Sequence, residues 1–197
     1  MNPLKSNVAV LSFAVAAAAV LACSRSSKPD PSGSSKGGVS SSSAARADLG
    51  SHVERLARAS TTRDVLSSLA DDCLSCAEKN GCLDPNRQGG ECEAVTGKAR
   101  GGRTATEQCV ETLRCVFSSK CANNGEQSQC LCGKTDVVEC MEGKSPPSGT
   151  CVAVYKDDFG SNGKAMYDQF LDRKFGSGQA NYIIQCVVPL CPTCRIR

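Results

Sequence analysis

The stretch Cys109-Val-Glu-Thr-Leu-Arg-Cys115-Val-Phe-Ser-Ser-Lys-Cys121 decides the fold, because it combines a helical pattern with three cysteines. Thr104 and Glu107 stand at the spacing of a capping box at its start. The apolar side of the helix comprises Val110, Leu113, Val116 and Phe117. Because an α-helix turns about 100° per residue, cysteines six positions apart lie about 240° from one another around its axis. The sequence therefore predicts a helix that is cross-linked on more than one side.

All but one of the fifteen cysteines lie between Cys73 and Cys194. An even number of cysteines in an exported chain is typical of a disulfide framework, here of seven bonds. The spacing does not identify the pairs, so the pairing stays open. The candidate disulfide residues are Cys73, Cys76, Cys82, Cys92, Cys109, Cys115, Cys121, Cys130, Cys132, Cys140, Cys151, Cys186, Cys191 and Cys194.

Other segments are also predicted to be helical. Apolar residues at spacings of three and four predict one helix from Thr61 or Thr62 to Asn80, ended by Gly81 in a left-handed conformation. Residues 165–175 form another, stopped by the glycines of 176–178, and residues 179–188 are helix or strand, with helix favoured and an end or kink at Pro189. Residues 130–132 are predicted to be extended, with two cysteines facing different partners. The predicted fold class is a mainly α, small disulfide-rich domain with short extended segments.

The N-terminus has the parts of an export signal, namely Lys5, an apolar run over residues 8–22 and then Cys23. Fifteen residues are too few to span a bilayer as a helix, which takes about 20. The run Val20-Leu21-Ala22-Cys23 resembles the lipobox of bacterial lipoproteins. That resemblance implies cleavage before Cys23, acylation of its sulfur and amine with palmitate-like chains, and, from Ser24, sorting to the outer membrane. The alternative is an ordinary cleaved signal with a chance cysteine nearby.

Lipidation of Cys23 accounts for the odd cysteine, which otherwise needs a separate explanation in an exported protein. Half of residues 24–43 are serine, and Val39 is the one large apolar side chain there. Such a segment buries too little surface to offset the entropy of ordering it. The predicted organisation is therefore a signal peptide over residues 1–22, a lipidated and flexible linker over 23–50, and the helical disulfide-rich domain over 51–197.

Composition excludes several classes of function. Residues 71–197 carry fifteen Lys/Arg against sixteen Asp/Glu, and the chain has no tryptophan, so no basic, aromatic surface for nucleic acid is predicted. His52 is the only histidine, which makes a Ser-His-Asp or Cys-His site improbable. Acidic pairs at 71–72, 157–158 and 168/172 are interpreted as solvated or helix-starting residues. The sequence predicts no catalysis, no metal and no cofactor.

Two Cys-x-x-Cys pairs keep a redox or metal function open as the alternative. Cys73/Cys76 and Cys191/Cys194 together have the spacing of a four-thiolate zinc site. Cys191-Pro-Thr-Cys194 resembles the active site of thioredoxin-like oxidoreductases, although three residues follow it and no helix can form there to activate a thiolate. A structural disulfide role is the favoured interpretation of both pairs.

The domain as a whole resembles uncharacterised cysteine-rich lipoproteins of myxobacteria. The residues that carry this resemblance, over about 100–194, are Cys109, Cys115, Cys121, Cys130, Cys132, Gly133, Cys186, Cys191 and Cys194. The resemblance implies an architecture and a cellular location, but the family has no established activity. The expected function is that of a structural or binding module, held to the periplasmic or surface face of the bacterial outer membrane through acylated Cys23, with the lipid bilayer and an unidentified protein or small molecule as partners.

Overall fold

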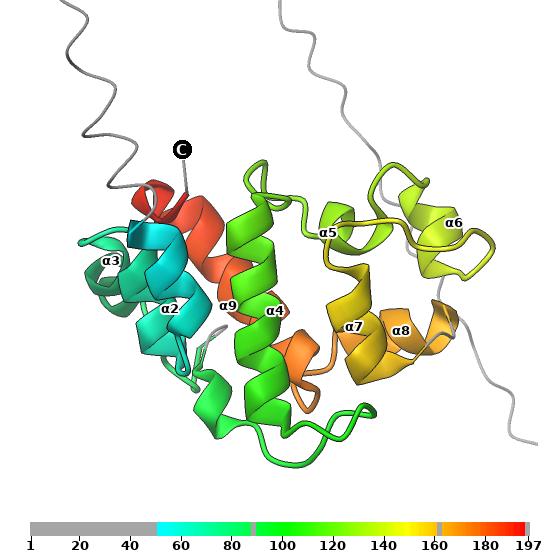
Figure 1. Ribbon diagram of the computed structural model, residues 1–197, viewed down its shortest axis with the longest axis horizontal. Helices are drawn as coiled ribbons and strands as arrows, with labels where there is room; N and C mark the ends of the chain where they lie inside the picture. The colour runs from blue at the N-terminus through cyan, green and yellow to red at the C-terminus, as the bar shows by residue number, and fades with distance from the viewer. Residues whose placement is uncertain (1–50, 88–89, 161–162, 196–197) are drawn as a thin grey trace, which may run out of the picture. The chain divides into compact units, whose positions relative to one another are not determined.

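The computed structural model describes residues 51–87, 90–160 and 163–195, with side chains described from residue 166 in the last range (Figure 1). The predicted signal peptide, Cys23 and the linker lie outside the described residues. A helical segment over residues 51–58 opens the described chain. The elements that follow are α2 (Thr62–Leu69), α3 (Cys73–Lys79), η1 (Cys92–Ala94), α4 (Ala105–Ser119), α5 (Ser128–Cys132), α6 (Val137–Met141), α7 (Val152–Phe159), α8 (Gly163–Phe170), α9 (Gly176–Leu190) and η2 (Pro192–Cys194). Within these ranges β pairing is limited to an isolated bridge between Lys98 and Thr104.

Helix α4 begins where the capping box predicts. The Thr104 hydroxyl accepts a hydrogen bond from the Glu107 backbone N–H at 3.1 Å, and the Glu107 carboxylate accepts one from the Thr104 N–H at 2.8 Å. These bonds satisfy backbone donors that have no partner within the helix. The helix ends at Ser119, and Lys120 follows in the left-handed region with φ of 59°. Leu113, Val116 and Phe117 are buried, as the apolar spacing predicts.

Helices α4 and α9 pack against each other at the centre of the fold, more extensively than any other pair of elements (Figure 1). The prediction that the glycines of 176–178 stop a helix is wrong, because Gly176 begins α9. A Cβ on Gly176 would lie 2.4 Å from the Ala105 carbonyl oxygen, and one on Gly178 would lie 2.0 Å from the Asp172 carbonyl oxygen. These two glycines therefore allow the start of α9 to lie close to neighbouring backbone segments, and they do not break the helix.

The predicted helix over residues 62–80 is two helices rather than one. Thr61 caps α2 through a box with Asp64, and α2 ends at Leu69 because Ala70 is extended, with φ of −162° and ψ of 156°. The chain then turns into α3, which starts at Cys73. Gly81, with φ of 71°, follows α3 in the left-handed conformation that was predicted. The change of direction allows Leu66 and Cys73 to be buried in one core.

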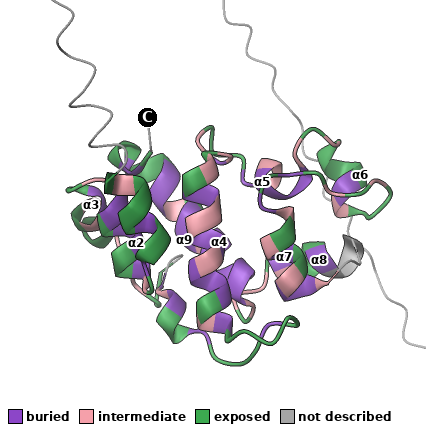
Figure 2. Cartoon of the chain, in the orientation of Figure 1, coloured by how far each residue is buried: buried purple, intermediate pink, exposed green. Residues whose placement is uncertain are grey.

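The remaining helices form the other half of the core beside α4 (Figure 1). Residues 130–132 lie in α5 and are helical, so the predicted extended segment is wrong. Helix α7, which the sequence did not predict, buries Tyr155 and Phe159. The ring of Tyr155 lies 5.5 Å from that of Phe170 in α8, measured between centroids. Buried residues continue along α4 and α9, while α6 is mainly exposed (Figure 2). The predicted fold class, a mainly helical disulfide-rich domain, is confirmed.

Candidate functional site

The fourteen cysteines from Cys73 to Cys194 form seven disulfides. The pairs are Cys73–Cys194, Cys76–Cys191, Cys82–Cys186, Cys92–Cys109, Cys115–Cys151, Cys121–Cys130 and Cys132–Cys140. As predicted, Cys109 and Cys115 bond to different parts of the chain, so α4 is cross-linked to η1 on one side and to the start of α7 on another. Cys130 and Cys132 also have different partners.

The two Cys-x-x-Cys pairs are joined to each other. Cys73 bonds to Cys194 and Cys76 to Cys191. The two cysteines of α3 are thus bonded to the two cysteines at the start and end of the η2 segment. In this pairing none of the four sulfurs is a thiolate, which is the form that binds zinc or attacks a disulfide. Among residues 51–87, 90–160 and 163–195, no cluster of three or more His, Cys, Asp or Glu side chains is placed to hold a metal ion.

His52 lies in the helical segment 51–58, where its Nδ1 is 2.9 Å from the Ser68 carbonyl oxygen. This contact joins the segment to α2, which is a structural role. Asp157 pairs with Arg103 at 3.3 Å and is about one-third exposed. Its neighbour Asp158 is different, because it is buried, and no pattern in the sequence predicted that burial.

The buried carboxylate of Asp158 lies at the start of α9. It accepts a hydrogen bond from the Ser177 backbone N–H at 2.7 Å. The Ser177 hydroxyl is 3.0 Å from that of Thr112, and the Gln108 side-chain amide donates to the Val154 carbonyl at 2.7 Å. Burial raises the pKa of Asp158, since desolvation disfavours the charged form more than the Ser177 hydrogen bonds favour it. This polar cluster links α4, α7 and α9 inside the core.

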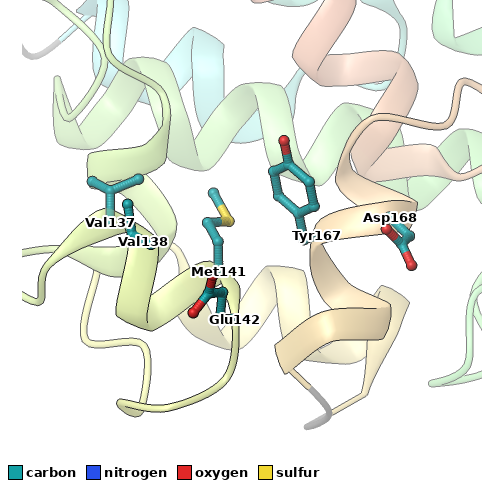
Figure 3. A pocket seen from close by; sticks show the side chains of 6 residues that line it. All are labelled: Val137, Val138, Met141, Glu142, Tyr167 and Asp168. Carbon is teal, nitrogen blue, oxygen red and sulfur yellow. The ribbon is translucent and has the colours of Figure 1, made fainter. Parts of the chain in front are cut away.

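A surface groove between α6 and α8 is the best candidate for contact with a partner (Figure 3). Its volume is about 660 Å³, within the usual range for ligand sites, and its lining residues are Val137, Val138, Met141, Glu142, Tyr167 and Asp168. Met141 of α6 and the ring of Tyr167 of α8 lie opposite each other, and Asp168 lies beyond Tyr167 (Figure 3). The lining is therefore mostly apolar.

Apolar side chains around this groove are unusually exposed. Val137 is 40 % exposed, Val138 62 % and Tyr167 42 %. Leu171, directly after α8, is also exposed, so four of the six large exposed apolar residues in the described chain lie on or next to α6 and α8. Isolated exposed apolar residues are ordinary, but a cluster marks a candidate interaction surface.

Two carboxylates border the groove. Glu142 pairs with Lys144 at 2.5 Å, and both side chains are at least half exposed, so this ion pair contributes little to stability. No pattern in the sequence predicted the groove. Its one local sign is the adjacent apolar pair Val137-Val138, and the apposition of α8 had no signal in the sequence.

No helix within the described ranges is both long enough and apolar enough to cross a membrane. Comparison of the chain with protein-family models, with curated protein sequences and with solved structures finds no match.

Proposed function

We propose that the chain is a bacterial lipoprotein whose disulfide-linked helical domain acts outside the cytoplasm as a structural or binding module. The observation that carries this proposal is the pairing of all fourteen cysteines of the domain with one another. Cys23 is then left as the single cysteine without a disulfide partner in the domain, at the position where a lipobox-like sequence places acylation. Seven disulfides also favour an oxidising compartment.

The proposed anchor is a set of acyl chains on Cys23. One chain gives only marginal binding to a bilayer, whereas two or three hold a protein stably. The resemblance of residues 20–23 to the lipobox, and of residues 100–194 to uncharacterised myxobacterial lipoproteins, supports an address at the outer membrane. The serine-rich linker between Cys23 and residue 51 would then separate the domain from the bilayer.

The proposed contact surface is the groove between α6 and α8. Its mostly apolar lining, with two carboxylates among the lining side chains, suits an apolar molecule or an apolar segment of a protein. The disulfide Cys132–Cys140 joins the end of α5 to α6 and so fixes the two helices against each other. A surface held in this way loses little conformational entropy when a partner binds.

Intact mass spectrometry tests the proposal. The full chain is purified from the membranes of its expression host and alkylated with N-ethylmaleimide before and after reduction. We expect no label before reduction, label on the fourteen domain cysteines after it, and a mature chain that begins at Cys23 with added acyl mass. A Cys23→Ser variant is the control and should stay uncleaved and unacylated. Two open thiols before reduction would overturn the structural interpretation in favour of thiol-disulfide chemistry, and an unmodified Cys23 would overturn the anchor.

Binding of a neutral apolar dye such as Nile red tests the groove. The Cys23→Ser chain is used after removal of the signal peptide with an engineered cleavage site, so that no detergent is needed. Val138→Ser should reduce the dye fluorescence by at least half, because Val138 is a mainly exposed part of the lining. Leu190→Ser is the matched control, since Leu190 is also about half exposed but lies at the end of α9. Equal loss in both variants would show that the groove is not a distinct apolar site.

A further inference from the structure

Two of the disulfides lie against each other. The Sγ of Cys121, which bonds to Cys130, is 3.9 Å from the Sγ of Cys151, which bonds to Cys115. The hydroxyl of Ser119 lies beside both sulfurs, 3.0 Å from that of Cys121 and 3.7 Å from that of Cys151. The four sulfurs therefore form one cluster at the C-terminal end of α4, next to α5 and the start of α7.

Two members of this cluster, Cys115 and Cys121, are partly exposed. Cys115 also lines a surface cavity of about 280 Å³, together with Val53, Ser118 and Val154. Its partner Cys151 is fully buried, as is Cys130. A small thiol can therefore reach the Cys115 sulfur, whereas the sulfur of Cys151 is shielded by the protein. Access decides which sulfur of a disulfide is attacked.

We propose that Cys115 is a site of modification by low-molecular-weight thiols, and that this modification rearranges the cluster. The incoming thiolate bonds to the Cys115 sulfur, the Cys115–Cys151 bond breaks, and its electron pair leaves Cys151 as a thiolate. The Cys151 thiolate then bonds to the Cys121 sulfur, the Cys121–Cys130 bond breaks, and Cys130 leaves as a thiolate that takes a proton from water. One thiol is consumed and one is formed, so the exchange involves no net oxidation.

The backbone is arranged for the rearranged pair. The Cys151 N–H donates to the Cys130 carbonyl at 2.9 Å, so the two residues are neighbours in space. The Sγ atoms of Cys151 and Cys121 are 3.9 Å apart, so they must approach by about 2 Å to reach the length of a disulfide bond. Cys151 can replace Cys130 as the partner of Cys121 once the two side chains close this gap. The Ser119 hydroxyl can donate a hydrogen bond to the Cys151 thiolate, which stabilises it near its target.

Peptide mapping after a short exposure to reduced glutathione at pH 8 tests the proposal on the full chain. The reaction is stopped with acid, and free thiols are then labelled with N-ethylmaleimide. We expect glutathione on Cys115, the label on Cys130 and a new Cys121–Cys151 cross-link. Label on Cys151 with Cys121–Cys130 intact would overturn the rearrangement, and absence of glutathione from Cys115 would overturn the site. At pH 4 the products should fall at least tenfold, because the thiolate is the attacking species.

A double variant, Cys121→Ser with Cys130→Ser, removes the second disulfide without leaving an odd thiol. We expect it to carry glutathione on Cys115 and the label on Cys151, because the released thiolate then has no neighbouring disulfide to attack. The matched control is Cys132→Ser with Cys140→Ser, which removes a disulfide with buried sulfurs and should leave the label on Cys130. Label on Cys130 to an equal extent before glutathione is added would contradict the proposal.

The single variant Ser119→Ala keeps all seven disulfides and provides an independent test. Loss of the hydrogen bond to the Cys151 thiolate makes that sulfur a poorer leaving group, so glutathione should form on Cys115 about tenfold more slowly. Label on Cys130 should appear correspondingly later, while the Cys121–Cys151 cross-link remains the product. An unchanged rate of glutathione addition to Cys115 would remove Ser119 from the mechanism.

Discussion

Asp158 shows how one residue joins three helices. Its carboxylate lies in the core at the end of α7 and binds the first turn of α9, close to the hydroxyls of Thr112 and Ser177. A helix N-terminus stabilises a negative charge, while burial disfavours it, and here burial is the larger effect. From the sequence, Asp157 and Asp158 are indistinguishable, because burial depends on which side of α7 faces α4.

The raised pKa of Asp158 predicts a pH dependence of stability. The folded protein holds this proton to a higher pH than the unfolded chain, in which the ordinary pKa is 3.8. The contribution of Asp158 to the free energy of unfolding is therefore greatest below pH 3.8 and decreases as pH rises through the folded-state pKa. Asp158→Asn should remove this contribution while keeping an oxygen that accepts from Ser177.

Chemical denaturation at several pH values between 3 and 8 measures this effect. The free energy of unfolding of the wild-type chain relative to Asp158→Asn should decrease steadily as pH rises and become constant above the folded-state pKa. Asp71→Asn, at an exposed position, is the control and should show no such trend. A relative stability that instead increases with pH would mean that Asp158 is stabilised as the charged form.

Gly176 is a position where size rather than conformation requires glycine. A Cβ there would lie 2.4 Å from the Ala105 carbonyl oxygen and 2.8 Å from the Cys109 nitrogen, both backbone atoms that cannot move independently of α4. Gly176→Ala should reduce the free energy of unfolding by about 1–3 kcal/mol through overpacking. Gln185→Ala, on the exposed side of the same helix, should change it by less than about 0.5 kcal/mol. Thermal unfolding of both variants checks the difference, and similar values for the two would show that α4 and α9 separate easily.

At the scale of single elements, the sequence predicts helices well where a local signal marks their ends. Helix α4 has a capping box at its start and apolar residues at helical spacing along one side. Helix α9 has apolar residues at helical spacing from Ile183 to Val187. Local signals fail where packing decides. The helix breaks after Leu69 because Ala70 is extended, although alanine by itself favours helix. The glycines at the start of α9 do not end a helix, because they lie where neighbouring backbone atoms leave no room for a Cβ.

The cap of α4 can be tested by itself. Thr104→Ala should reduce the free energy of unfolding by about 1 kcal/mol, because it removes the hydroxyl that accepts from the Glu107 backbone N–H and donates to the Glu107 carboxylate. It should also raise the pKa of Glu107, which hydrogen bonds from the Thr104 backbone and hydroxyl now lower. Ser118→Ala, at the exposed other end of α4, should change neither quantity. Denaturation and an NMR titration of Glu107 measure the two effects, and a lower stability with an unchanged Glu107 pKa would contradict the box.

At the scale of the whole molecule, three disulfides are nested. Cys73–Cys194, Cys76–Cys191 and Cys82–Cys186 each join the first part of the domain to the last. An isolated loop of 121 residues, as closed by the outermost bond, would give about 5 kcal/mol of stabilisation on the chain-entropy model. With Cys76–Cys191 in place, however, the same bond closes a ring of only about eight residues, which gives about 2–3 kcal/mol.

Nesting therefore predicts that removal of a long-range bond is no more harmful than removal of a local one. Cys73→Ser with Cys194→Ser should reduce the free energy of unfolding by about 2–3 kcal/mol. Cys132→Ser with Cys140→Ser, whose positions are eight apart, should cost about the same. Denaturant titrations without reductant compare the two. A loss for the first variant that is twice the loss for the second would show that the three bonds act independently.

The candidate sites differ in how far the sequence could predict them. The number of disulfides followed from an even count of cysteines, and the different partners of Cys109 and Cys115 from helix geometry. The pairs themselves depend on how helices far apart in sequence pack, and so does the groove, where Val138 and Tyr167 come from α6 and α8. The contact between the sulfurs of Cys121 and Cys151 likewise depends on how the end of α4 packs against the start of α7.

The nested bonds have a consequence for degradation. Every peptide bond between Cys82 and Cys186 is spanned by the same three disulfides. A protease that cuts any loop in this region leaves two fragments covalently joined, so the cleaved domain migrates at its full mass until it is reduced. A single cut therefore releases no fragment until these bonds are reduced, and it leaves every helix of the domain attached to the N-terminal part of the chain.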